Sequence, residues 1–176
     1  IDLNNVLSKL KTNLKADWVG LREVKETTTH RIIRDIKPAS NNVSIDHGIM
    51  VEVLVDVHLG YYGTHDISYE AIKNAADKAC KQALNASKYS IYPFSENVRP
   101  KSVGQYKSPC LVNEMPLDDL MGILIESNKV LKKSDEIVSA ISMARVVNMD
   151  MKFVSSNGSD FEQSFMYVGP GFRVIA

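Results

Sequence analysis

The stretch VEVLVDVHLGYYGTHDISYEAIKNAADKACKQA, residues 51–83, decides the fold because its periodicity changes along its length. Its first part alternates between apolar and polar residues, which is the pattern of a strand. One face of this predicted strand consists of Val51, Val53, Val55 and Val57, and the other of Glu52, Leu54, Asp56 and His58. Gly60 and Gly63 then interrupt a short return strand. A pair of strands is therefore predicted.

A helix is predicted after the strand pair, from Ser68 to about Ala86. Ser68 is a good N-cap, and Glu70 lies in the first turn, where a negative charge interacts favourably with the helix dipole. The inner face is a narrow stripe of small residues, namely Ile72, Ala76, Ala79 and Ala83. Such residues allow a helix to lie close against a sheet.

Upstream, residues 2–14 predict a helix, with Asp2 as N-cap and leucine and valine at helical spacing. The β-branched residues that follow predict two strands, at about 18–26 and 29–37. PASNNVSIDHG, residues 38–48, contains proline, asparagine, serine and glycine in close succession. That composition predicts a long turn.

Downstream, residues 89–116 contain four prolines and little periodicity, which predicts a long irregular connection. Helical spacing resumes in PLDDLMGILIESNKVLKK, residues 116–133, and GPGF, residues 169–172, is typical of a turn. Four strands are predicted in EIVSAISMARVV, MKFVSS, DFEQSFMYV and FRVIA. Asn157-Gly158 predicts a type I′ hairpin turn, in which both central residues need positive φ.

The predicted order is helix, strands and helix, followed after the connection by helix and strands. The strands form consecutive runs and do not alternate with helices, so we expect an α+β fold with a mainly antiparallel sheet and about three helices.

Composition excludes several classes of function. Twenty-one basic residues balance twenty-one acidic ones, so no net charge favours nucleic acid or a membrane surface. Cys80 and Cys110 suggest neither a disulfide framework nor a zinc site. No apolar run approaches the roughly 18 residues of a membrane span, and no signal peptide is visible. We therefore expect a cytoplasmic protein.

His58, His65 and Asp66 are the candidates for a metal or acid–base site, because two of the four histidines lie here beside aspartates. Their spacing matches no standard ligand pattern, and no third ligand is evident nearby. His58 fits a hairpin and His65 a loop before a helix. The sequence therefore predicts no catalytic, metal-binding or cofactor-binding residue, with these three as weak candidates only.

The segment from Gly48 to Ala83 resembles the signature region of the TldD/PmbA family, once called modulators of DNA gyrase. The residues that carry this resemblance are Gly48, Val53, Leu54, Gly60, Tyr61, Thr64, Asp66 and Ile67. Three further regions agree in order, and they contain Ala16 to Trp18, Tyr106, and Ser155 to Gly158. The resemblance covers essentially the whole chain. One local departure is Val57, where the family commonly has glycine after aspartate.

The resemblance implies that residues 1–176 form an N-terminal domain. Its parts would be a helix, strands and helix at 1–88, an irregular linker at 89–116, and a helix and strands at 117–176. Active family members are similar to zinc metallopeptidases and carry an HExxxH helix. No His-Glu pair occurs in this sequence. We therefore expect no cofactor in this chain, and expect zinc in a C-terminal metallopeptidase region that the chain lacks.

The first functional hypothesis, which follows from the resemblance, is a non-catalytic domain that helps unfolded peptides reach a site elsewhere. It would also help subunits associate into a homo- or hetero-oligomer. A stand-alone interaction module, or a catalytically silent partner subunit, is the alternative. An enzyme acting through His58, His65 and Asp66 is the third hypothesis. Proteolysis is a family property, and a chain without HExxxH is not expected to be active by itself.

Overall fold

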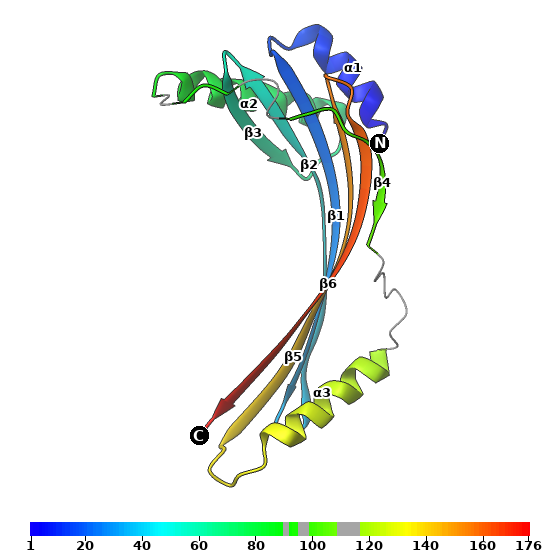
Figure 1. Ribbon diagram of the computed structural model, residues 1–176, viewed down its shortest axis with the longest axis vertical. Helices are drawn as coiled ribbons and strands as arrows, with labels where there is room; N and C mark the ends of the chain where they lie inside the picture. Colours follow the sequence, from blue (N-terminus) through cyan, green and yellow to red (C-terminus); the bar gives the residue numbers. More distant parts are fainter. Residues whose placement is uncertain (90–91, 95–98, 109–116) are drawn as a thin grey trace. The chain divides into compact units, whose positions relative to one another are not determined.

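The computed structural model describes residues 1–89, 92–94, 99–108 and 117–176 (Figure 1). Its elements are α1 (Leu3–Asn13), β1 (Trp18–Arg34), β2 (Lys37–Val55), β3 (His58–Thr64), α2 (Tyr69–Ser87), β4 (Val103–Lys107), α3 (Leu117–Leu131), β5 (Ser139–Ser155) and β6 (Asp160–Ile175). The strands form a sheet in the order β3-β2-β1-β5-β6-β4. The predicted α+β class with a mainly antiparallel sheet is therefore confirmed.

Two compact units divide the chain. The first contains residues 1–25, 47–106 and 150–163, and the second contains residues 26–46, 107–149 and 164–176. The strands β1, β2, β5 and β6 each contribute residues to both units. The units therefore cut across the predicted segments 1–88 and 117–176, because each long strand belongs partly to one unit and partly to the other.

The core of the first unit lies between its part of the sheet and the helices α1 and α2 (Figure 1). Asp2 caps α1 by accepting hydrogen bonds from the backbone amides of Asn4 and Asn5, and Ser68 caps α2 by accepting one from Ala71. Both caps agree with the sequence prediction. The fully buried face of α2 consists of Ile72, Ala75, Ala76, Ala79 and Ala83.

The hairpin of β2 and β3 turns at Asp56 and Val57, which have φ of 47° and 58°. The register pairs Val55 with His58. His58 therefore lies on the same sheet face as the valines, and its predicted place on the face of Glu52 is wrong. Val57 was predicted on the valine face but is a turn residue with 41% exposure. The two turn residues interrupt the strand, so the alternation of side chains between the two sheet faces starts again at His58. The sequence periodicity does not show this interruption.

The predicted turn at 38–48 is wrong, because these residues belong to β2. Likewise, β1 is one continuous strand and not two, and it ends at a turn formed by Asp35 and Ile36, with φ of 49° and 67°. The register with β3 covers β2 only from Ile49 to Val55. The earlier part of β2 is therefore at the sheet edge in the described residues, where proline and asparagine are tolerated.

The last part of the chain forms two long strands, β5 and β6, where four short strands were predicted. The GPGF segment continues β6 and is not a turn. The hairpin at Asn157-Gly158 is in the predicted place, but only Gly158 has positive φ, at 91°. The Gly158 amide donates to the Ser155 carbonyl, so the loop has one residue more than a type I′ turn.

Within the predicted irregular stretch 89–116, residues 103–107 form β4. The Asp160 amide donates to the Ser102 carbonyl and the Ser108 amide to the Ser164 carbonyl, so β4 runs parallel to the start of β6. Pro109, Cys110 and Pro116 lie outside the described residues.

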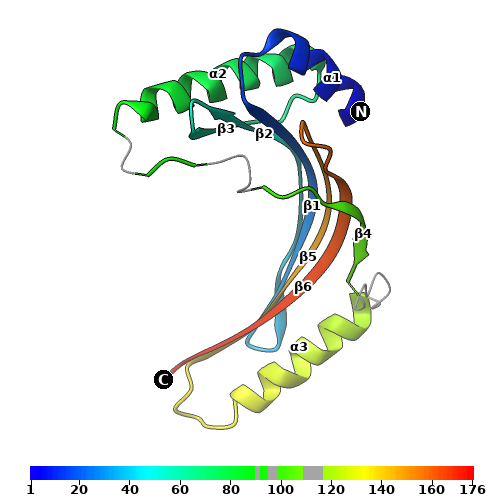
Figure 2. The ribbon, with the colours of Figure 1, turned by 45° about the horizontal axis from the view of Figure 1, so that its top comes forward.

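In the second unit, α3 packs beside β1 and β5 (Figure 2). Leu124 contacts Ile33 and Ala144 in a small buried cluster. Asn128 is fully buried in the same interface. It donates from Nδ2 to the Ala140 carbonyl over 3.0 Å, and its Oδ1 accepts the Ile36 amide over 2.8 Å. This one side chain therefore joins the helix, the hairpin turn and β5.

Candidate functional site

His58 is buried, with 9% exposure, at the start of β3. Its Nδ1 contacts the carbonyl oxygen of Asp56 across the hairpin turn. Its Nε2 is buried without a hydrogen-bond partner among the described residues. The imidazole therefore packs behind the turn and does not face solvent.

His65 is exposed beyond the other end of β3, so the strand separates the two histidines. Asp66 begins the turn into α2, where its Oδ1 accepts the Ser68 amide over 2.8 Å. That backbone hydrogen bond, strengthened by the Ser68 side chain, lowers the pKa of Asp66 below its ordinary value. The structure explains Asp66 as a residue that starts a helix.

The described residues do not fit a zinc ion. They contain no group of three or more His, Cys, Asp or Glu side chains that could hold a metal. His58 and His65 lie at opposite ends of one strand, and the Asp66 carboxylate is used by a backbone amide. No helix in the described part is long and apolar enough to cross a membrane.

The sequence does not indicate an ion cluster that forms around the buried Glu52. Glu52 is 1% exposed on the sheet face opposite the valines. Arg22 contacts Oε1 from β1, and the Arg99 Nη2 lies 3.2 Å from Oε2 without the alignment of a hydrogen bond. Two guanidinium groups offset the cost of burying one carboxylate. Through these two ion pairs Glu52 joins β2 to β1 and to the chain after residue 98.

Two regions of the family resemblance meet beside this cluster. The Trp18 Nε1 donates to the Asn157 Oδ1 over 3.1 Å, and the Asn157 Nδ2 donates to the Arg99 carbonyl over 2.8 Å. The Ser156 hydroxyl accepts the Val19 amide over 3.0 Å. These motif residues therefore fasten the β5–β6 turn to β1 and to the chain after residue 98.

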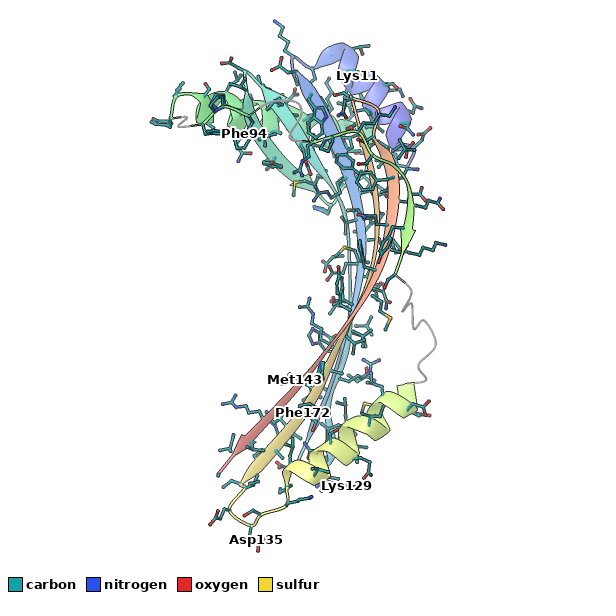
Figure 3. All side chains as sticks on the ribbon, in the orientation of Figure 1. Lys11, Phe94, Lys129, Asp135, Met143 and Phe172 are labelled. Atoms are coloured by element: carbon teal, nitrogen blue, oxygen red, sulfur yellow. The ribbon has the colours of Figure 1, made fainter. Side chains whose placement is uncertain are left out.

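The second unit contains an apolar groove between α3 and the sheet, with a volume of about 450 Å³. Leu120, Ile123 and Leu124 line it from the helix. Val168 and Phe172 line it from β6, and Phe172 is labelled in Figure 3. Ile123, Val168 and Phe172 are each more than half exposed, so the groove is open to solvent.

Two polar side chains line the same groove, Arg31 on β1 and Asn148 on the neighbouring strand β5. Arg31 is only 8% exposed. Its Nη1 donates to the carbonyl oxygens of His30 and Asn42, whereas its Nε and the Asn148 Oδ1 are buried without a hydrogen-bond partner among the described residues. Neither residue stands out in the sequence, because each is one of several polar residues in its strand.

The comparisons with known proteins concern the family and the fold. Residues 19–83 match the family model PmbA/TldA metallopeptidase domain 1. A solved structure of a candidate modulator of DNA gyrase from Bacteroides thetaiotaomicron is similar with a TM-score of 0.70 and 13% identity, covering 99% of this chain and 41% of that one. No curated protein sequence matches the chain.

Two more solved structures share the fold. A second candidate modulator of DNA gyrase, from Thermotoga maritima, has a TM-score of 0.62 and 11% identity over 98% of this chain and 42% of that one. TldE from Thermococcus kodakarensis has a TM-score of 0.63 and 16% identity over 99% of this chain and 39% of that one. This chain thus spans about two-fifths of the length of these structures. The match over residues 19–83 and the shared fold support the resemblance of this chain to an N-terminal domain of the TldD/PmbA family.

Proposed function

We propose that the chain is a non-catalytic N-terminal domain of a TldD/PmbA-like zinc metallopeptidase, where it receives unfolded peptide and joins subunits. The matching family model is that of a metallopeptidase domain. In this proposal the zinc ligands and the general base lie outside residues 1–176. A cytoplasmic location, and a homo- or hetero-oligomer with another family member, are parts of the same proposal.

The observation that carries this proposal is the edge of β2 in the second unit, which no described strand covers. Residues 39–45, ASNNVSI, carry no charge, and all of them are exposed or partly exposed. Val43 and Ile45 are 52% and 64% exposed. Edge strands usually carry charges that discourage the addition of another strand. An uncharged edge with exposed β-branched residues is suited to accept an extended peptide through backbone hydrogen bonds.

The same edge supports the alternative functions, because a strand from a second subunit would add in the same way. A stand-alone interaction module would use the edge for assembly alone. A catalytically silent partner subunit would hold peptide for an active relative. Reading the gene beyond Ala176 for an HExxxH helix separates an active parent protein from these two alternatives.

Peptide capture is tested by hydrogen exchange with a short unstructured Ser/Val peptide as the probe. We expect slower exchange of the amides in residues 39–45 when the peptide is present. Val43→Lys should abolish this protection, because a lysine on an edge disfavours strand addition. Val130→Lys is the matched control, since Val130 is 58% exposed and lies on α3, not on the strand β2.

Unchanged exchange at residues 39–45 in the presence of the peptide would overturn peptide capture at this edge. Sedimentation velocity of the chain alone examines assembly. Association that Val43→Lys removes and Val130→Lys retains would assign the edge to a subunit contact instead.

A further inference from the structure

We propose that the groove of the second unit binds the C-terminal residue of a peptide, with its carboxylate on Arg31 and its apolar side chain between α3 and β6. The proposal rests on the proposed function in taking a peptide as the ligand. It differs in place, because the groove lies between α3 and the sheet whereas the proposed strand addition uses residues 39–45 of β2.

The apolar part of the groove suits an aliphatic side chain. Its volume of about 450 Å³ is within the range of small-ligand pockets. Ile123, Val168 and Phe172 remain 54%, 55% and 55% exposed in the chain alone. Covering these three side chains would remove apolar surface from water, which favours an apolar occupant.

The charge of the groove selects a carboxylate. Arg31 is more than nine-tenths buried, and it forms no ion pair with any Asp or Glu in the described part of the chain. Two backbone carbonyls use its Nη1, which leaves the Nε side of the guanidinium without a partner among those residues. A buried cation is stabilised by an anion, and the planar guanidinium fork matches a carboxylate in geometry.

Asn148 distinguishes a peptide from a simple fatty acid. Its buried Oδ1 has no donor among the described residues, and it lines the same groove from the strand next to that of Arg31. The last residue of a peptide carries a carboxylate, an amide N–H and a side chain on adjacent atoms. These three groups match Arg31, the Asn148 oxygen and the apolar walls, whereas an acyl chain offers no donor for Asn148.

The test compares an acetylated tetrapeptide ending in leucine, as the free acid, with the same peptide as its C-terminal amide. Binding to the full chain is followed by isothermal titration and by NMR shifts of α3, β5 and β6. We expect the acid to bind, and amidation to weaken binding roughly 10- to 100-fold, as for the loss of a charge-assisted hydrogen bond. Equal affinity for acid and amide overturns the proposal.

Two variants separate the groove from general effects. Arg31→Met removes the charge at similar volume and should reduce the affinities for acid and amide to the same low level. Ile123→Glu places a negative charge on an exposed position of the groove, which spares the fold, and should also abolish binding of the acid. Val130→Glu, on the same helix and outside the groove, should leave binding unchanged. Retained binding in Ile123→Glu contradicts the proposal.

The outcomes also separate this proposal from the proposed function. One outcome is that the peptide slows amide exchange in residues 39–45, while its affinity is changed neither by amidation nor by Ile123→Glu. That outcome supports edge capture and overturns the groove site. Shifts confined to groove residues support the groove and overturn edge capture. Decanoate serves as a third probe. If decanoate binds more tightly than the peptide acid, the ligand is an acyl chain and not a peptide, and the proposal is overturned.

Discussion

The helices α2 and α3 each cover part of the sheet, but they do so with side chains of different size. The helix α2 presents alanines, and it lies so close to β3 that a Cβ added at Gly60 would be 2.0 Å from the Ala79 carbonyl oxygen. The helix α3 presents Leu120, Met121 and Leu124. Its interface includes the open groove of about 450 Å³.

Side-chain size therefore separates a closed interface from an open one. Small residues allow backbone to approach backbone, so little space remains for a ligand. Larger residues hold a helix farther from the sheet, and the space between them is filled only where other side chains reach.

The largest effect is expected at Gly60 in the first unit. Gly60→Ala places a Cβ against backbone atoms of α2 that cannot move independently, and should lower the free energy of unfolding by about 3 kcal/mol. Gly63→Ala is the matched control on the same strand, because its Cβ would meet Met50 Cε at an ordinary 3.6 Å. Urea denaturation measures both. Equal stabilities would mean that α2 does not depend on close approach.

The packing of α3 in the second unit depends on the hydrogen bonds of Asn128, whereas the packing of α2 in the first unit depends on small residues. Asn128→Leu leaves the Ile36 amide and the Ala140 carbonyl without their side-chain partner, and should lower the free energy of unfolding by about 2 kcal/mol. Ser127→Ala, at the preceding position of α3, should have little effect. A stabilising Asn128→Leu, seen by urea denaturation, would show that apolar packing governs α3 as well.

The two hairpin turns extend the comparison, because each has a β-branched residue with positive φ. The first-unit turn is held by the Asp17 carboxylate, which accepts the Asp56 amide over 2.9 Å. Val57→Gly should relieve strain and raise the free energy of unfolding by about 1 kcal/mol. Val43→Gly, in an exposed strand position, should instead lower it. A higher melting temperature for the first variant and a lower one for the second would bear out this difference.

The smallest effect concerns acid stability of the second-unit turn. The Ala140 amide, and then the Lys132 ammonium, lower the pKa of Asp35 below its ordinary 3.8. The folded state thus prefers the charged form, so this stabilisation is present above 3.8 and is lost as pH falls through the lower, folded pKa. Asp35→Asn should flatten the dependence of the urea midpoint on pH in this acidic range. An unchanged slope would contradict a role for Asp35.

Much of the fold could be predicted because its signals are local. The caps Asp2 and Ser68 begin helices where the sequence indicates, and the alternation from Val51 to Val55 forms a strand. Predictions are wrong where proline or glycine indicated a turn within what is one continuous strand. Pro38 and the Gly169–Gly171 segment lie inside long strands, because the sheet edge tolerates residues that an inner strand would not.

The candidate sites show the same limit. His58, His65 and Asp66 are candidates by residue type, yet His58 packs behind the β2–β3 turn, Asp66 accepts a backbone amide at the start of α2, and His65 is exposed. Glu52 is notable because its partners Arg22 and Arg99 are distant in sequence. Arg31 is notable because its Nε has no hydrogen-bond partner among the described residues. In the sequence each is only a polar residue within a strand, and nothing nearby in the sequence indicates which groups surround it.

The sequence by itself determined the helices, the strand alternation, the α+β class and the resemblance to the TldD/PmbA family, because these depend on spacing over a few residues. Only the tertiary structure decided which strands are continuous, where Glu52 finds its two arginines, and that a groove with Arg31 lies under α3. Those features depend on burial and on contacts between distant residues, which periodicity does not encode.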